Sequence, residues 1–412
     1  MPSRRVFLKS SAFAIFGAGS IPGWLSRSVY AAEGAGRRNK ILVAVFQRGA
    51  VDGLNMVIPF GEQRYYDLRP SLAIPKPDGT PQSAVDLDGF FGLHPSLAPL
   101  KPIFDSQRLA IVDAVGSPDP TRSHFDAQDY MESGTPGLKA TSDGWMNRAL
   151  PRIAGPISPV RAVSLGSSLS RTLRGRNDAV AVGNLNDFQV RDTRGAATFE
   201  SMYDNTLDTM LHGAGKETFS AVKVMQTIQK QKYTPANGAK YPGGGLGNNL
   251  QQIARLIKAD VGLEVAFADI GGWDTHVNEV GANSSVGQLA NNLAQFSQSL
   301  AAFYQDLGDR MADVTLVTMS EFGRTARENG NRGTDHGHAN VMFVMGGDVR
   351  GGKVYGDWPG LAEEQLYEGR DLALTTDFRD VLGELVAMHL GNRNLRAVFP
   401  GYENPKFRGL IV

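Results

Sequence analysis

The sequence predicts an α/β protein built around a mainly parallel central sheet. Continuous apolar runs of about six residues recur along the chain, and strands buried on both faces of a parallel sheet have this composition. An amphipathic stretch at 289–311 leads directly into one such run at 314–319, as in half of a parallel βαβ unit. The 48 glycines indicate many tight turns and long connecting loops.

The apolar runs define the expected strands in chain order. Several of these runs end at polar, glycine-bearing turns, and ligands of open α/β sheets gather at such strand ends. Helices are expected where apolar residues recur every three or four positions. The expected strands are 40–46, 109–115, 160–165, 263–270, 314–319 and 341–345, and the expected helices are 218–232, 247–259, 289–311 and 377–390.

We expect one large domain, residues 38–412, with loop insertions near 60–100 and 170–250. No internal repeat is visible, and no shift in composition divides the chain. The length also permits two domains, since a domain usually contains about 100–200 residues. Hydrophobic residues make up 42% of the chain, which argues against disorder.

Residues 1–31 are typical of a twin-arginine signal peptide. Arg4 and Arg5 precede a modestly apolar stretch that ends in small residues, as at a processing site. An amphipathic first helix is the alternative, but glycine and proline within the stretch disfavour it. The stretch is also too short and too broken for a membrane span. We therefore expect cleavage after Ala31, with the twin-arginine translocation machinery as export partner, and a soluble protein in the periplasm or secreted beyond it.

The composition excludes several classes of function. The chain has 42 basic and 42 acidic residues, and loss of residues 1–31 removes four basic residues and no acidic one. The mature protein is then slightly acidic, which gives no nucleic-acid footprint. The chain contains no cysteine, so disulfides, cysteine nucleophiles and thiolate metal ligands are excluded.

Two short glycine-flanked segments are the strongest candidates for a functional site. Residues 271–276 (GGWDTH) follow the expected strand 263–270, and residues 333–338 (GTDHGH) precede the expected strand 341–345. Imidazole and carboxylate groups displayed together are common ligands of divalent metals and common partners in acid–base catalysis. The alternatives are a structural histidine in a turn and a chance grouping in a loop. The candidate metal ligands are Asp274, His276, Asp335, His336 and His338.

Further candidates follow the first two strands. Asp52 is either a metal ligand or a turn-forming residue before a glycine. Ser123 and Thr121 are expected at the start of a helix, where free backbone amides favour an anionic group. The alternative is that they are simple N-caps. For the adjacent His124, the sequence indicates neither a catalytic nor a metal-binding role.

Glu321 and Arg324 follow the expected strand 314–319. Glu321 could bind a metal, and Arg324 could bind an oxyanion through its planar fork of donors. The alternative is an internal ion pair between them, because buried charges are usually paired. His94 is expected to be a turn residue, and His389 a packing residue on the last helix.

The order of these segments resembles that of the DUF1501 family of exported bacterial proteins. The resemblance covers nearly the whole chain and rests on the signal, on the two histidine segments and on FQRGAVDG (46–53), RSHF (122–125) and SEFGRT (320–325). That family is similar to the alkaline phosphatase and sulfatase superfamily. The resemblance implies an alkaline-phosphatase-like three-layer sandwich with long loop insertions and with one or two metals at the strand ends.

The resemblance also implies roles for individual residues. These are Asp52 as the first-strand ligand, Ser123 as nucleophile with Thr121 as the alternative, Asp274 and His276 as a ligand pair, Glu321 as a late-strand acid, and His336 or His338 as the final imidazole.

Two departures from the superfamily pattern imply that one or both metal sites are altered or lost. Its phosphatases usually space the first Asp and His four residues apart, whereas Asp274 and His276 are two apart and Asn278 holds the four-residue position. Where those enzymes carry an Asp-His pair on the late strand, this chain has Glu321 and Phe322.

The expected function is an exported, metal-dependent hydrolase of phosphate or sulfate esters with a serine nucleophile. The histidines favour zinc, and the carboxylates also admit calcium, magnesium or manganese. Formylglycine-dependent sulfatase chemistry is disfavoured, because there is no cysteine and the prolines of 117–122 have the wrong offsets. The alternative is a non-catalytic exported scaffold or glycan-binding protein. A further exported protein or a surface polymer is a candidate partner.

Overall fold

The computed structural model describes residues 39–139, 141–150, 157–185, 221–222 and 224–412. The expected signal peptide, residues 1–31, lies outside the described residues, so it stays a prediction. Across the described part of the chain, no helix is both long enough and apolar enough to cross a membrane.

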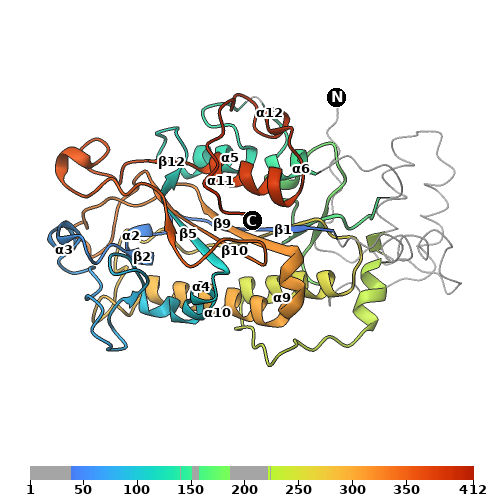
Figure 1. The fold of residues 1–412 in the computed structure, drawn as a ribbon, viewed down its shortest axis with the longest axis horizontal. Coiled ribbons are helices and arrows are strands. Elements are labelled where there is room, and N and C mark those ends of the chain that lie inside the picture. Colours follow the sequence, from blue (N-terminus) through green and yellow to red (C-terminus); the bar gives the residue numbers. More distant parts are fainter. Residues whose placement is uncertain (1–38, 140, 151–156, 186–220, 223) are drawn as a thin grey trace, which may run out of the picture.

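A mainly parallel sheet forms the centre of the molecule (Figure 1). Its strands are β1 (Ile41–Gln47), β5 (Leu109–Gly116), β6 (Ala162–Leu165), β7 (Val180–Val182), β8 (Val265–Ile270), β9 (Val314–Ser320), β10 (Asn340–Gly346), β11 (Val354–Tyr355) and β12 (Thr376–Asp377). Within the described residues the order is β11-β5-β10-β9-β1-β8-β6-β7, and β12 also pairs with β5. β10 is antiparallel to β9 and β5, and the other pairs are parallel. The six expected strands and the α/β fold class are confirmed.

Helices cover both faces of the sheet, which gives three layers (Figure 1). One face carries η1 (Pro95–Leu100), α4 (Lys101–Asp105), α9 (Gly245–Lys258) and α10 (Gln288–Leu307). The other carries α5 (His124–Ser133), α6 (Trp145–Ala149), α11 (Phe378–Glu384), the π-helical turn η6 (Leu385–His389) and α12 (Leu395–Val398).

The insertion after β1 holds a small antiparallel sheet. It consists, in the described residues, of β2 (Val57–Ile58), β4 (Gly92–Leu93) and β3 (Val85–Asp86), in that order. The remaining short elements are α2 (Gly53–Met56), α3 (Gln63–Leu68), η2 (Arg171–Leu173), η4 (Gly308–Asp313) and η5 (Glu363–Gln365).

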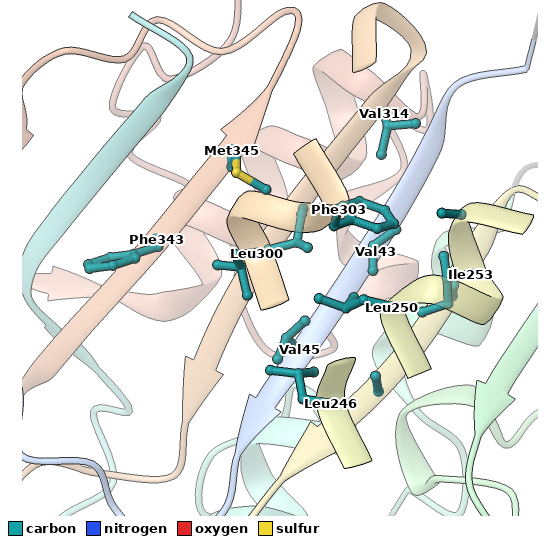
Figure 2. Packing of buried hydrophobic residues seen from close by; sticks show 14 of the residues in the cluster. Val43, Val45, Leu246, Leu250, Ile253, Leu300, Phe303, Val314, Phe343 and Met345 are labelled. Atoms are coloured by element: carbon teal, nitrogen blue, oxygen red, sulfur yellow. The ribbon is translucent and has the colours of Figure 1, made fainter. Parts of the chain in front are cut away.

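The alternation of side chains along β1 explains the three layers. Successive residues of a strand point to opposite faces. Val43 and Val45 pack with α9 and α10, beside Leu250 and Phe303 (Figure 2). Leu42, Ala44 and Phe46 belong to the core on the other face. Because both faces are covered, the strand must be apolar at every position, which is the pattern seen in the sequence.

The helices begin and end where local chemistry allows. The helix expected at 289–311 ends at Leu307, because Gly308 has φ +49 and the chain continues as η4. The side chain of Asp377 accepts a hydrogen bond from the amide of Arg379 at 2.9 Å and caps α11. The helix expected at 247–259 is α9. Of the stretch 218–232, residues 218–220 and 223 lie outside the described residues, and 221–222 and 224–230 are helical.

The topology brings five loops to one edge of the sheet. β1, β5, β8 and β9 run in the same direction, so their carboxyl ends meet at that edge, and the antiparallel β10 begins there. The loops are 48–52, 117–123, 271–279, 321–326 and 334–339.

Asp113 gives a test of the buried core. It lies on β5 with 6% exposure, and its Oδ2 has no hydrogen-bond partner among the described residues. Burial raises its pKa from 3.8 to about 7. Between these pH values the folded chain binds more protons than the unfolded chain, so stability falls as pH rises.

We therefore expect Asp113→Asn to stabilise the protein by up to about 4 kcal/mol at pH 8 and to have little effect near pH 4. Thermal unfolding of both forms across this range measures the effect. An equal change in Tm at every pH would contradict it.

Candidate metal centre

Among the described residues, three imidazoles and one carboxylate converge at the strand-end edge. The Nε2 atoms of His124 and His276 lie 3.0 and 2.9 Å from Nε2 of His336. Oδ1 of Asp274 lies 3.0, 3.3 and 3.5 Å from Nε2 of His276, His336 and His124. The side chains are 24–48% exposed, so solvent reaches the cluster. His124 begins α5, and the other residues come from the loops after β8 and before β10.

The second nitrogen of each ring contacts an acceptor. Nδ1 of His124 lies 2.8 Å from Oε1 of Glu321, and Nδ1 of His276 lies 3.1 Å from Oδ1 of Asp335. Nδ1 of His336 lies 2.9 Å from the backbone oxygen of Arg122. Carbonyl and ionised carboxylate oxygens only accept hydrogen bonds, so each Nδ1 carries a proton. In each neutral ring, Nε2 therefore directs its lone pair into the cluster.

The carboxylates that hold the rings are stabilised in the ionised form. Burial opposes the ionisation of Glu321, but hydrogen bonds, first from His124 and then from its own backbone amide and Gln128, hold its pKa below the usual value. Burial likewise opposes the ionisation of Asp335, and hydrogen bonds from His276 and Asn329 hold its pKa low. Such carboxylate–histidine pairs are the usual outer layer of metal sites.

The donor set fits a divalent metal. Four acceptors at these distances repel one another unless a cation lies between them, and a proton on one ring would bridge only one pair. With Zn–N distances of 2.0–2.1 Å, a tetrahedral zinc separates its ligands by about 3.3 Å. The ligand atoms of His124, Asp274 and His336 all lie within 4.8 Å of one another, at 3.0–3.5 Å. Nε2 of His276 lies at 2.9 and 3.0 Å from those of His336 and Asp274, beside this group of three.

Arg324 is buried behind the cluster, and its donors are used within the protein. Nη2 donates to Oδ1 of Asp274 at 2.6 Å. Burial opposes the ionisation of Asp274, but Arg324 lowers its pKa to about 2. Arg324 therefore holds a candidate ligand in place, and its guanidinium does not face open space. Its other acceptors are the backbone oxygens of Ala50, Thr334, Gly49 and Trp273, at 2.7, 3.1, 2.6 and 3.0 Å.

Four of the seven residues expected to bind metal supply no atom to the cluster, and two of these, Asp52 and His338, have other partners. The carboxylate of Asp52 is buried and receives two hydrogen bonds from Arg69, at 2.5 and 2.9 Å. The ring of His338 is 8% exposed and stacks on Tyr367, with 4.5 Å between ring centroids. The structure thus separates His336 from His338. Glu321 and Asp335 contact the Nδ1 atoms of His124 and His276, on the side of each ring that faces away from the cluster.

The two candidate nucleophiles precede His124 closely in the chain. Ser123 is the N-cap residue of α5, and its side chain makes no capping hydrogen bond. Its amide donates to Oγ1 of Thr121 at 3.2 Å. The Ser123 hydroxyl is therefore free of the local role that a serine at this position usually has.

His124 is the residue of the cluster to which the sequence assigned no role. It lies at a helix start, and its contacts are with Glu321 and His336, about two hundred residues further along the chain. The local sequence offers one indication of its role: like His276 and His336, His124 lies close to the end of a strand.

The structure is similar to members of the alkaline phosphatase superfamily. A Vibrio parahaemolyticus protein of that superfamily is 10% identical, with a TM-score of 0.32, and the match covers 77% of this chain and 62% of that one, less than two thirds of its length. The C-terminal periplasmic domain of EcEptC from Escherichia coli, in complex with zinc, is 12% identical, with a TM-score of 0.35 and coverage of 76% and 73%. A sulfatase from Pseudoalteromonas sp. is 10% identical, with a TM-score of 0.37 and coverage of 96% and 79%.

At the level of sequence, no curated protein matches. A family model does match: the one described as "Protein of unknown function (DUF1501)" covers residues 110–396. This is more than half of the chain, which therefore belongs to the DUF1501 family.

Proposed function

We propose that this chain is an exported, metal-dependent hydrolase of phosphate or sulfate esters, with a divalent metal held by His124, Asp274, His276 and His336. The observation that carries the proposal is the solvent-accessible group of His124, Asp274 and His336, with Nε2 of His276 within 3.0 Å of two of their ligand atoms. Three imidazoles favour zinc over the harder cations calcium, magnesium and manganese, which prefer oxygen ligands.

The residues around this point have distinct roles in the proposal. A divalent ion bound there supplies Lewis acidity, which polarises an ester oxygen and lowers the pKa of a hydroxyl beside it. Glu321 and Asp335 keep the rings of His124 and His276 in the tautomer that presents Nε2. Ser123 offers the nucleophilic hydroxyl, with Thr121 as the alternative.

The sequence motif around Arg4 and Arg5 supports export through the twin-arginine translocation machinery. The site of action would then be the periplasm or the cell exterior. An exported protein or a surface polymer remains the proposed class of partner.

A second candidate function is that of a non-catalytic exported scaffold or glycan-binding protein. If all four side chains bind one ion, protein ligands fill its shell, as in structural zinc sites, whereas catalytic sites usually keep one position open. The donors of Arg324 are also directed to loop carbonyls and to Asp274 instead of a bound anion. These two observations favour a centre that stabilises the loops.

The neighbouring histidines His336 and His338 provide a matched test of the metal site. We expect the parent to bind about one divalent metal per chain, and His336→Asn to bind it at least tenfold more weakly, on the order seen when metal-site contacts are lost. His338→Asn should keep the affinity of the parent, because its ring stacks on Tyr367 outside the cluster. Elemental analysis and competition with a chelator measure both. Equal metal content in the parent and the His336 variant would contradict the assignment.

Ser123→Ala tests the chemistry separately from the metal. With aryl phosphate and aryl sulfate esters as substrates, we expect kcat/KM to fall by at least about 100-fold while the metal content stays constant. Thr121→Val is the control and should retain most of the activity if Ser123 is the nucleophile. A metal-loaded parent that turns over neither ester would count against the hydrolase and for the non-catalytic candidate.

A further inference from the structure

Glu279 lies in the loop between β8 and α10 and is completely buried, with 0% exposure. Its Oε2 accepts hydrogen bonds from Oγ1 of Thr275 at 3.0 Å and from Oγ1 of Thr334 at 2.9 Å. Thr275 stands between two of the candidate ligands, and Thr334 lies two residues before a third. One oxygen atom of Glu279 therefore joins the two loops that carry three of the four candidate ligands.

The two loops are packed directly against each other around this contact. The amide of Thr334 donates to the backbone oxygen of Thr275 at 3.2 Å, and the amide of Glu279 donates to that of Arg332 at 2.9 Å. A Cβ atom at Gly333 would lie 2.4 Å from the backbone oxygen of His276, so only glycine permits this approach. Because the backbones of the two loops are in contact, a change in the distance between the loops would also change the distance between the candidate ligands that they carry.

Arg324 and Glu279 hold these loops in different ways. Arg324 donates to both loops, at Trp273 and Thr334, and also connects them to the end of β1 through the backbone oxygens of Gly49 and Ala50. The carboxylate of Glu279 contacts the two loops through the side chains of Thr275 and Thr334, and all three side chains are buried. Buried hydroxyl groups are nearly always hydrogen-bonded, because water is not there to replace a lost partner. The contacts of Thr275 and Thr334 to Glu279 are therefore expected to persist.

We propose that Glu279 is a positioning residue for the metal centre: through Thr275 and Thr334, it sets the separation between the loop of Asp274 and His276 and the loop of His336. This inference rests on the metal centre of the proposed function. It assigns to Glu279 no contact with metal or substrate.

Glutamine is the matched replacement for this residue. Burial, followed by the negative charge of the nearby Asp52, raises the pKa of Glu279 well above its usual value. A neutral side chain of the same shape that keeps an acceptor oxygen therefore preserves the contacts. Leucine keeps most of the volume but removes the acceptor.

The experiment uses cobalt as a spectroscopic probe of the metal-free protein. The visible absorption of bound Co²⁺ reports its coordination geometry, and its titration gives an affinity. We expect Glu279→Leu, and the double variant Thr275→Val with Thr334→Val, to bind Co²⁺ at least tenfold more weakly, in the range of about 10–100-fold for groups that orient ligands, with an altered spectrum. Glu279→Gln, and Thr275→Ser with Thr334→Ser, should keep the parent spectrum and affinity.

The Tm of the metal-free forms separates positioning from a purely structural role. If Glu279 only stabilises the fold, the leucine and double-valine variants will have a lower Tm but bind Co²⁺ with the affinity and spectrum of the parent, and the inference is then overturned. If the leucine variant does not fold, the double-valine variant carries the test, because valine has the shape of threonine. A parent that binds no Co²⁺ would overturn the metal centre itself, and this inference with it.

Discussion

The strand-end region depends on the hydrogen bonds of one buried side chain, the guanidinium of Arg324. Removing a cation from water is unfavourable unless all its donors find acceptors. Here the acceptors come from the loops after β1 and β8, from the loop before β10 and from the carboxylate of Asp274. These loops are separate in sequence, so the burial of one side chain fixes them relative to one another and places a candidate ligand at the same time.

The charges of the cluster support the same interpretation. Interactions within the site keep Asp274, Glu321 and Asp335 ionised, with pKa values below their usual range. Arg324 supplies one positive charge beside Asp274. The hydrogen bond with Glu321 also raises the pKa of His124, which favours positive charge on that ring. The buried carboxylate of Asp52 is paired with Arg69 and supplies no atom to the cluster.

Topology and chemistry are linked through the direction of the strands. The parallel strands deliver the ends of β1, β5, β8 and β9 to one edge, and the reversal at β10 returns the chain there with His336. His124 reaches the cluster because α5 begins shortly after β5. The hydrolase and the non-catalytic scaffold would share this construction. They differ in whether a substrate can join the four protein ligands on the exposed side.

The sequence by itself determined the strands, the main helices and the concentration of candidate ligands in two segments. These properties are local: a strand covered on both faces must be apolar at every position, and Asp274, His276 and His336 lie in short motifs beside strands. Only the tertiary structure decided the partners. In the folded protein Asp52 pairs with Arg69, His338 stacks on Tyr367, and His124 contacts His336. Side-chain direction and long-range proximity are set when the helices and sheet pack, and short sequence patterns do not encode them.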